Sequence, residues 1–488
     1  MTVFTDHLQQ HFYSAFKSGE SLHCSEVLTQ GLDKPTLVSS NQLLAEQLGI
    51  DPQELTSPEM LQIMSGNQMP ASSQPIALVY SGHQFGVWAG QLGDGRAITL
   101  GELAVGKDAA LWDIQLKGAG PTPYSRFADG RAVLRSSIRE YLCSEAMYGL
   151  GIATTRALCL VDSKTPVYRE EVEPGATLCR VAQSHIRFGS FEHFHYRNQP
   201  QAVKALADYL IERHFPEWKE RDNKYLLMLE NCVIKTAKMI AQWQSVGFNH
   251  GVMNTDNMSI LGDTIDYGPF GFLDNYNPDF ICNHSDTNGR YAFKNQPSVG
   301  LWNLNALATS LTSLLDNDQL IGALKRYEPE FLNQYRTIMA KKIGLQDYRA
   351  EDEQLINQLL EILQHNSVDY SIFFRTLCDF SEQNQRLRDQ FLDRQAFDNW
   401  AKKYVLRLQQ QSCSAQQRRE NMQAVNPKYV LRNYMAQTAI EKAYEGDYSE
   451  VNLLLEILQS PFAEHPHAEK YAGLPPDWAE MISVSCSS

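Results

Sequence analysis

The sequence predicts an α+β protein in which a small β-rich lobe is followed by a larger helical lobe. Short apolar runs broken by glycine lie between residues 76 and 116, whereas amphipathic helical patterns fill 201–247 and most of 300–460. The chain has 488 residues, more than one hydrophobic core usually supports. We therefore expect at least two lobes with a ligand cleft between them.

The order of these patterns divides the chain into four parts. Polar helices and loops over 1–75 indicate an N-terminal extension packed on the core, and 76–180 form the small lobe. Residues 181–400 form the helical lobe, which includes a polar loop region at 249–272. Residues 401–488 form a C-terminal helical extension with a cysteine-containing tail.

Composition restricts the partners. The 43 lysines and arginines are outnumbered by 57 acidic residues, a net charge of −14, so we expect no nucleic-acid or anionic-membrane partner, and any anion site must be local. No signal peptide or spanning segment is evident, which favours the cytoplasm. The nine cysteines show no zinc-finger spacing, so we expect no structural zinc site.

A glycine-rich loop precedes the first long apolar strand. Gly90, Gly93 and Gly95 are followed by Arg96, and their missing Cβ atoms would let backbone N–H groups approach a phosphate. A hairpin turn built on Asp94 and Gly95 explains the same residues equally well. The loop alone therefore does not establish nucleotide binding.

A lysine ends one of the predicted strands. Lys117 follows an apolar run, where a charge is costly unless it has a partner. Glu140, in the helix predicted over 131–150, could provide that partner, as the strand lysine and helix glutamate do in protein kinases. Two unrelated surface charges are the alternative.

The loop region 249–272 resembles the catalytic and metal-binding segments of kinases. His250 and Asn257 keep the spacing of the catalytic loop, and Asp266 begins an Asp-Tyr-Gly triplet where kinases have Asp-Phe-Gly. An amide and a carboxylate at this separation can share one Mg²⁺ or Mn²⁺ ion. These residues predict an atypical protein-kinase-like bilobal fold.

The kinase base is absent from its usual position. Val252 stands where kinases have the catalytic aspartate, and valine cannot accept a proton. A carboxylate occurs instead at Asp256, beside the predicted metal ligand Asn257. Asp256 could also be a helix cap or a turn residue. Ordinary protein phosphorylation is therefore not expected.

Two arginines lie seven residues apart next to apolar residues. Guanidinium groups suit phosphate oxygens, and on a helix Arg180 and Arg187 would share a face, whereas on a strand they would lie on opposite faces. Structural salt bridges are the alternative interpretation.

Long strings of the sequence resemble the selenoprotein O family of kinase-like protein adenylyltransferases. They are YSGHQFG from Tyr80, LKGAGPTPYSR from Leu116, DGRAVLR from Asp129, NHGVMNTDNM from Asn249, DYGPFGF from Asp266, NPKYVLRN from Asn426 and the terminal CSS from Cys486.

The resemblance implies transfer of AMP from ATP, or UMP from UTP, to Ser, Thr or Tyr hydroxyls of proteins, with pyrophosphate released and Mg²⁺ or Mn²⁺ as cofactor. It implies a catalytic base at Asp256, metal ligands at Asn257 and Asp266, and Glu140 as the residue that positions Lys117. It implies a nucleotide pocket of Gly93, Gly95, Arg96, Lys117, Asp129, Gly130, Arg180, Arg187 and Asp266.

Two alternatives remain open at this point. If Asp256 is only a turn residue, the chain is a catalytically inactive nucleotide-binding pseudokinase scaffold. The His-Gly and Asp-Tyr-Gly segments also occur in small-molecule kinases, which makes a phosphotransferase the second alternative.

One prediction concerns redox chemistry. Cys486 stands where some members of the family have selenocysteine, and we expect it to pair with Cys282, in the segment after Asp266. Mass spectrometry of the oxidised protein should then detect a peptide crosslinked through 282 and 486. Oxidised protein without that peptide would contradict the pairing.

Overall fold

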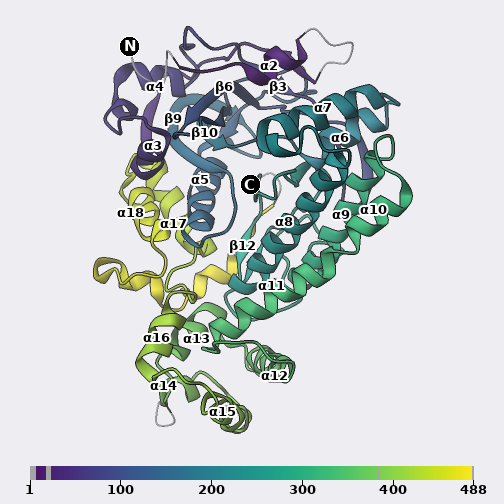
Figure 1. The fold of residues 1–488 in the computed structure, drawn as a ribbon. Coiled ribbons are helices and arrows are strands. Elements are labelled where there is room, and N and C mark those ends of the chain that lie inside the picture. Colours follow the sequence, from purple (N-terminus) through teal and green to yellow (C-terminus); the bar gives the residue numbers. More distant parts are fainter. Residues whose placement is uncertain (1–6, 18–22, 382–384, 486–488) are drawn as a thin grey trace.

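The computed structural model describes residues 7–17, 23–381 and 385–485. A β-sheet occupies the first part of the chain, and the remainder is mainly helical (Figure 1). Within the described residues no helix combines the length and apolar character needed to cross a membrane. The mixed α/β architecture that the sequence predicts is confirmed.

The main sheet has eight strands, and its neighbouring strands pair antiparallel in the order β1-β3-β6-β7-β10-β9-β2, with β8 on β10. Its central strands are almost fully buried, which explains why their sequences form nearly continuous apolar runs. The strands are β1 (Cys24–Glu26), β2 (Thr36–Ser40), β3 (Ile76–Leu78), β6 (Ala97–Val105), β7 (Ala110–Lys117), β8 (Ala132–Val133), β9 (Arg156–Tyr168) and β10 (Val172–Ala182).

Helices cover both faces of this sheet. Successive strand residues alternate between two cores: Val161 packs with helices α3 (Gln42–Leu48) and α4 (Pro58–Met64), whereas Leu160 packs with α5 (Leu134–Gly149). Because α5 lies between the sheet and later helices, most of its residues are buried. A polar group on α5 therefore needs a partner.

The predicted boundaries differ from the observed elements in three places. Residues 1–75 were expected to form helices and loops, but they also provide β1 and β2, the two edges of the sheet. These strands are short and β1 is partly polar, so they show little hydrophobic periodicity. The boundary at 180 falls inside β10, and the boundary at 400 falls inside α15.

The helical part is organised around α8, a helix of 23 residues that ends where Gly247 adopts a left-handed φ of 74°. A separate apolar core joins the helices from α11 to α16. The helices are α2 (His11–Phe16) in the first part, then α6 (Phe188–His195), α7 (Pro200–His214), α8 (Lys224–Val246), α9 (Gln296–Ser310), α10 (Asn317–Leu324), α11 (Tyr327–Lys342), α12 (Asp352–His365), α13 (Tyr370–Leu377), α14 (Gln385–Arg388), α15 (Arg394–Leu408), α16 (Ala415–Gln423), α17 (Asn433–Tyr444) and α18 (Ser449–Gln459).

The C-terminal helices α17 and α18 return to the first part of the chain. They pack against α5, as the yellow ribbons of Figure 1 show. The approach is close, because a Cβ on Gly149 would lie 2.1 Å from the carbonyl oxygen of Leu458. Gln459 also donates to Glu145 of α5 at 3.1 Å. The C-terminal extension therefore supports the helix that carries Glu140.

Lys342 gives a stability prediction for the helical part. Its Nζ atom lies 4.3 Å from the ring centroid of Phe374, and burial lowers its pKa to about 7. Among the described residues no carboxylate lies within 4 Å of it. Between pH 7 and 10.5 this lysine is therefore protonated in the unfolded chain but not in the folded one. The free energy of unfolding should rise with pH across that window.

Lys342→Met should raise the free energy of unfolding at pH 7 by on the order of 4 kcal/mol, and the gain should shrink as the pH approaches 10. Urea titrations at several pH values measure this difference. The exposed Lys204→Met is the matched control and should show no such pH-dependent gain. A Lys342→Met variant whose stability follows that of the wild type at every pH would contradict the prediction.

Candidate active site

One cleft of about 920 Å³ brings together the predicted nucleotide, base and metal residues. Its walls come from the sheet, from the loops at 93–97 and 124–131, and from the loops at 252–257 and 266–269. The predicted residues that line it are Gly93, Gly95, Arg96, Lys117, Asp129, Gly130, Arg180, Arg187, Asp256, Asn257 and Asp266.

Antiparallel pairing places Lys117 and Arg180 on adjacent strands. Lys117 is the last residue of β7, and Arg180 lies on β10, the strand that pairs with β7. Glu140 of α5 contacts both side chains. It forms an ion pair with Lys117 and accepts a hydrogen bond from Arg180 Nη1 at 3.2 Å. Burial lowers the pKa of Lys117, while Glu140 opposes that shift. Lys117 and Glu140 are therefore partners rather than unrelated surface charges.

Asp266 is held by both arginines. Arg180 Nη1 donates to Asp266 Oδ1 at 2.6 Å, and Arg187 Nη1 donates to Oδ2. Arg187 is the N-cap residue of α6, so the pair lies neither on one helix nor on one strand. Burial would raise the pKa of Asp266, but the guanidinium groups of Arg187 and Arg180 hold it well below its usual range.

A short antiparallel ladder joins the two polar loops. β11 (Phe248–Asn249) pairs with β12 (Gly271–Phe272), so the loops that follow β11 and precede β12 lie close together. The buried His250 donates from Nε2 to the carbonyl oxygen of Ile265 at 2.8 Å. His250 thus fixes the backbone beside Asp266, which has a left-handed φ of 58°.

Positive charge gathers in this cleft although the chain is acidic. Seven lysine or arginine side chains line it against four aspartates, whereas the whole chain has a net charge of −14. Arg180 and Arg187 are buried, and buried guanidinium groups attract anions more strongly than exposed ones because water screens them less. The cleft therefore has the local surplus of positive charge that suits a polyanion such as a nucleoside triphosphate.

Asp256 lies at the cleft with an unpaired oxygen. Its side chain is mostly buried, and Oδ1 makes no hydrogen bond within the described residues. Oδ2 accepts from Gln84 at 3.3 Å. Burial raises the pKa of Asp256 to about 7, although Arg187 opposes the shift. A carboxylate in this state can take a proton from a hydroxyl group near neutral pH.

Asn257 and Asp266 supply the oxygen donors that suit a divalent ion. Asn257 Nδ2 donates to the carbonyl oxygen of Val252 at 3.0 Å, which orients the amide and leaves Oδ1 as the acceptor atom. Amide and carboxylate oxygens are the ligands that Mg²⁺ and Mn²⁺ prefer. The residues present therefore fit such an ion.

The glycine-rich loop connects two different sheets. It runs from β5 (Val87–Gln91), which pairs with β4 (Ser81–Gln84), to β6 of the main sheet. The hairpin alternative for Asp94 and Gly95 is therefore wrong. A Cβ on Gly93 would lie 2.5 Å from the ring of Tyr124, and φ of Gly93 is 124°, so this position requires glycine.

Asp129 and Gly130 lie in the loop before β8. Arg169, in the turn between β9 and β10, donates to both oxygens of Asp129 at 2.8 and 2.9 Å. This ion pair ties the loop before β8 to the turn between β9 and β10. Because β8 itself pairs with β10, both contacts hold the loop at the cleft. Sequence reasoning missed Arg169, which belongs to no motif.

Sequence reasoning also gave no role to the turn between β4 and β5. The string YSGHQFG, which spans this turn, is nevertheless one of those that carry the family resemblance. Gln84 contacts Asp256, and Phe85 lines the cleft at a left-handed φ of 51°. The Phe85 N–H donates to the Tyr291 hydroxyl oxygen at 3.0 Å and to Asn254 Oδ1 at 3.1 Å. A strained, half-exposed phenylalanine beside the predicted base is typical of a functional position.

The two redox candidates are placed differently. Cys282 is buried, and its Sγ atom lies 2.6 Å from the carbonyl oxygen of Pro269. Cys486 lies outside the described residues. The backbone N–H of His284 donates to the carbonyl oxygen of Val484 at 2.9 Å, so the last described residues approach the segment that contains Cys282. Their pairing stays a prediction.

Comparisons with known proteins extend over nearly the whole chain. A family model described as protein adenylyltransferase SelO matches residues 6–459. A protein nucleotidyltransferase YdiU of Pectobacterium atrosepticum is 53% identical over 454 residues, 93% of this chain and 94% of that protein. The YdiU proteins of Vibrio vulnificus and Herminiimonas arsenicoxydans are 51% and 49% identical, with at least 95% of each chain covered.

Gly82 tests the geometry of the cleft. A Cβ at this position would lie 2.8 Å from Asp256 Oδ1 and 3.1 Å from Asp256 Cβ, so Gly82→Ala should displace the carboxylate. We expect the catalytic rate to fall by at least about 10-fold, because small displacements of a reacting group are costly. Steady-state kinetics and nucleotide titrations should separate this loss from any change in nucleotide affinity. Gly322→Ala, where a Cβ meets nothing within 4 Å, is the control; equal rates in both variants would contradict the prediction.

Proposed function

The chain belongs to the protein adenylyltransferase SelO family, and from this membership we propose that it transfers AMP from ATP, or UMP from UTP, to Ser, Thr or Tyr hydroxyls. It is an enzyme of the nucleotidyltransferase class with a nucleotide and a protein as substrates. The observation that carries the proposed chemistry is the unpaired oxygen of Asp256 in a cationic cleft.

We also propose that the fold is an atypical kinase-like one with two lobes. The main sheet lies within residues 24–182 and the chain beyond it is mainly helical, and the cleft is lined by the sheet and by loops of this later part. The pair between a strand lysine and a helix glutamate supports the proposal, as does the convergence of Asn257 and Asp266 on the same cleft. Fold alone does not decide the reaction, since related folds support different chemistry.

The position of the base favours nucleotidyl over phosphoryl transfer. Val252 lines the cleft where a kinase has its aspartate, and it offers no acceptor for a proton. Asp256 lies four residues further, beside the metal ligand predicted at Asn257. The family resemblance implies a nucleotide whose α-phosphate, rather than its γ-phosphate, faces the acceptor. In that orientation an acceptor hydroxyl served by Asp256 meets the α-phosphate.

In the proposed reaction the acceptor oxygen forms a bond to the α-phosphorus as its proton passes to Asp256. The bond between the α-phosphorus and the oxygen bridging to the β-phosphate breaks, and pyrophosphate leaves. Lys117, Arg180 and Arg187 lie in the cleft and neutralise phosphate charge, and Glu140 positions Lys117. The protein supplies orientation and electrostatic stabilisation, which dominate catalysis of such transfers.

Mg²⁺ or Mn²⁺ would be held by Asn257 and Asp266. When bound, the ion supplies positive charge to the phosphate oxygens. Arg180 and Arg187 neutralise the Asp266 carboxylate in this structure, and their guanidinium groups also suit phosphate oxygens. Asn257 is oriented by its bond to Val252 before any ligand arrives.

The acceptor side of the cleft is the turn between β4 and β5. Gln84 holds one oxygen of Asp256, and the ring of Phe85 lies 5.1 Å from that of Tyr291. Phe85 is 38% exposed although it lines the cleft, which leaves its ring available to the side chain that carries the acceptor hydroxyl. We assign this turn to the protein substrate.

Labelled ATP tests the proposed reaction. With ATP labelled at the α-phosphate, the wild-type chain should label its acceptor proteins, whereas label at the γ-phosphate should not be transferred. Asp256→Asn should slow transfer by about 10²- to 10⁴-fold, the usual contribution of a general base, with nucleotide binding retained.

Asp279→Asn, which changes an exposed aspartate paired with Lys294, is the matched control and should transfer at the wild-type rate. Transfer from the γ-phosphate alone would contradict nucleotidylation. A wild-type rate in Asp256→Asn would contradict the role of Asp256 as the base, but it would not contradict nucleotidylation itself.

A further inference from the structure

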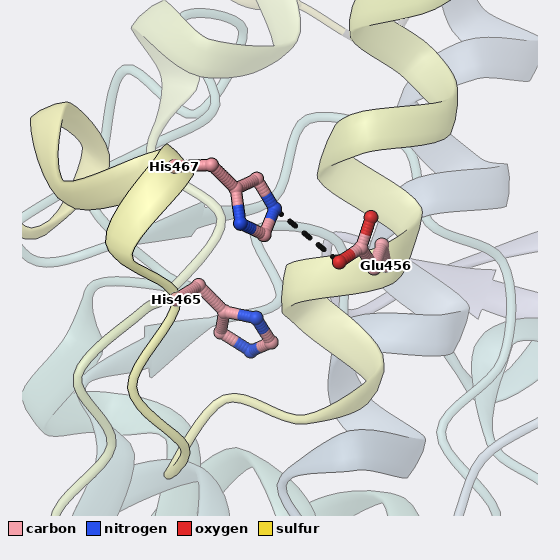
Figure 2. A group of neighbouring side chains, drawn as sticks. All are labelled: Glu456, His465 and His467. Atoms are coloured by element: carbon pink, nitrogen blue, oxygen red, sulfur yellow. Dashed lines mark ion pairs between the residues drawn. The ribbon is translucent and has the colours of Figure 1, made fainter.

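Two histidines and a glutamate meet on the surface near the C-terminus. Glu456 projects from α18, and His465 and His467 come from the segment that follows this helix (Figure 2). One ligand atom from each of the three lies within 4.8 Å of the other two. None of the three lines the cleft described above. The cluster therefore has no part in the proposed transfer reaction.

Two of the donor atoms are spaced as they are in metal sites. His467 Nε2 lies 3.3 Å from Glu456 Oε1, close to the separation of two ligands on one tetrahedral ion. His465 Nε2 lies 3.2 Å from the carbonyl oxygen of Ser460, which can only accept, so Nε2 carries the proton. His465 Nδ1 therefore keeps its lone pair. A backbone carbonyl that fixes the tautomer of a histidine is a common feature around metal-binding histidines.

The segment that carries the histidines is held in place. Tyr429 is buried, and its hydroxyl lies 3.3 Å from both the backbone nitrogen and the backbone oxygen of His465. Ala468, one residue beyond His467, is fully buried and donates to the His465 carbonyl at 2.9 Å. The two imidazoles therefore extend from an ordered turn, so little conformational entropy would be lost when they bind an ion.

Charge around the cluster favours a cation. The neighbouring Glu464 and Glu469 are paired with Arg375 and Lys428. Among the described residues no lysine or arginine lies within 4 Å of the Glu456 carboxylate. With neutral imidazoles the cluster has one negative charge and three donor atoms facing one another.

We propose that Glu456, His465 and His467 bind a late first-row divalent ion, Zn²⁺ above all, with water in the remaining position. Imidazole nitrogen selects Zn²⁺, Ni²⁺ or Cu²⁺ over Mg²⁺, whereas the oxygen donors Asn257 and Asp266 suit Mg²⁺ or Mn²⁺. The ion ties the segment after α18 to that helix, which packs against α5. The site is separate from the cleft of the proposed transfer chemistry.

Binding is measured with the full chain free of any histidine tag and stripped of metal by a chelator. Zn²⁺ is titrated by calorimetry with Mg²⁺ in excess. The Mg²⁺ occupies the site proposed at Asn257 and Asp266, so the titration reports Zn²⁺ binding elsewhere. One Zn²⁺ per chain should bind, and His467→Ala and Glu456→Gln should each weaken that binding at least about 10-fold. His365→Ala, an exposed histidine on α12, is the matched control and should bind as the wild type does.

Thermal unfolding provides a second readout that does not depend on activity. Zn²⁺ should raise the Tm of the wild type and of His365→Ala but not that of His467→Ala, because a ligand bound only by the folded state stabilises it. Circular dichroism without metal should show equal folding of all variants. Wild-type protein that binds no Zn²⁺, or a His465→Ala/His467→Ala variant that binds it unchanged, would overturn the proposal. Cys413 is the one described cysteine that is not buried, so loss of binding in Cys413→Ser instead would also overturn the proposal.

Discussion

The ion pairs of the partly buried Asp266 carboxylate with the guanidinium groups of Arg180 and Arg187 are the interaction on which the site depends. The two buried cations are stable there only because the Asp266 carboxylate neutralises them and they share further partners. Glu140 and Gln115 accept from Arg180, and the Asp256 carbonyl accepts from Arg187. The network thus connects the predicted metal ligand, the phosphate-binding residues and the base.

The fold supplies this network from four separate places. Adjacent antiparallel strands place Lys117 near Arg180, α5 brings Glu140 into contact with both, and Arg187 is the N-cap residue of α6. The β11–β12 ladder then brings Asp266 to the same point. Helices α17 and α18 pack against α5, so the C-terminal extension contributes to the site without lining it. This arrangement explains why residues far apart in the sequence lie together in the cleft.

Residues with a strong local requirement could be predicted from the sequence. A lysine at the end of an apolar strand needs a partner, and valine in place of a catalytic aspartate has an evident chemical consequence. Asp129 and Arg169 lie 40 residues apart in two turns, and only the pairing of β8 with β10 brings them together. The edge strands β1 and β2 are too short to show periodicity. His465 and His467 have no motif spacing with Glu456, because their proximity depends on the turn after α18.

Product analysis tests the central claim, nucleotidyl rather than phosphoryl transfer, most directly. Purified chain, ATP, a divalent ion and an acceptor protein are incubated, and pyrophosphate, ADP and modified acceptor are quantified together. The arrangement of Asp256, Val252 and the cationic cleft predicts one pyrophosphate for each acceptor modified and no ADP. ADP formed in equal amount to the modified acceptor, without pyrophosphate, would contradict it.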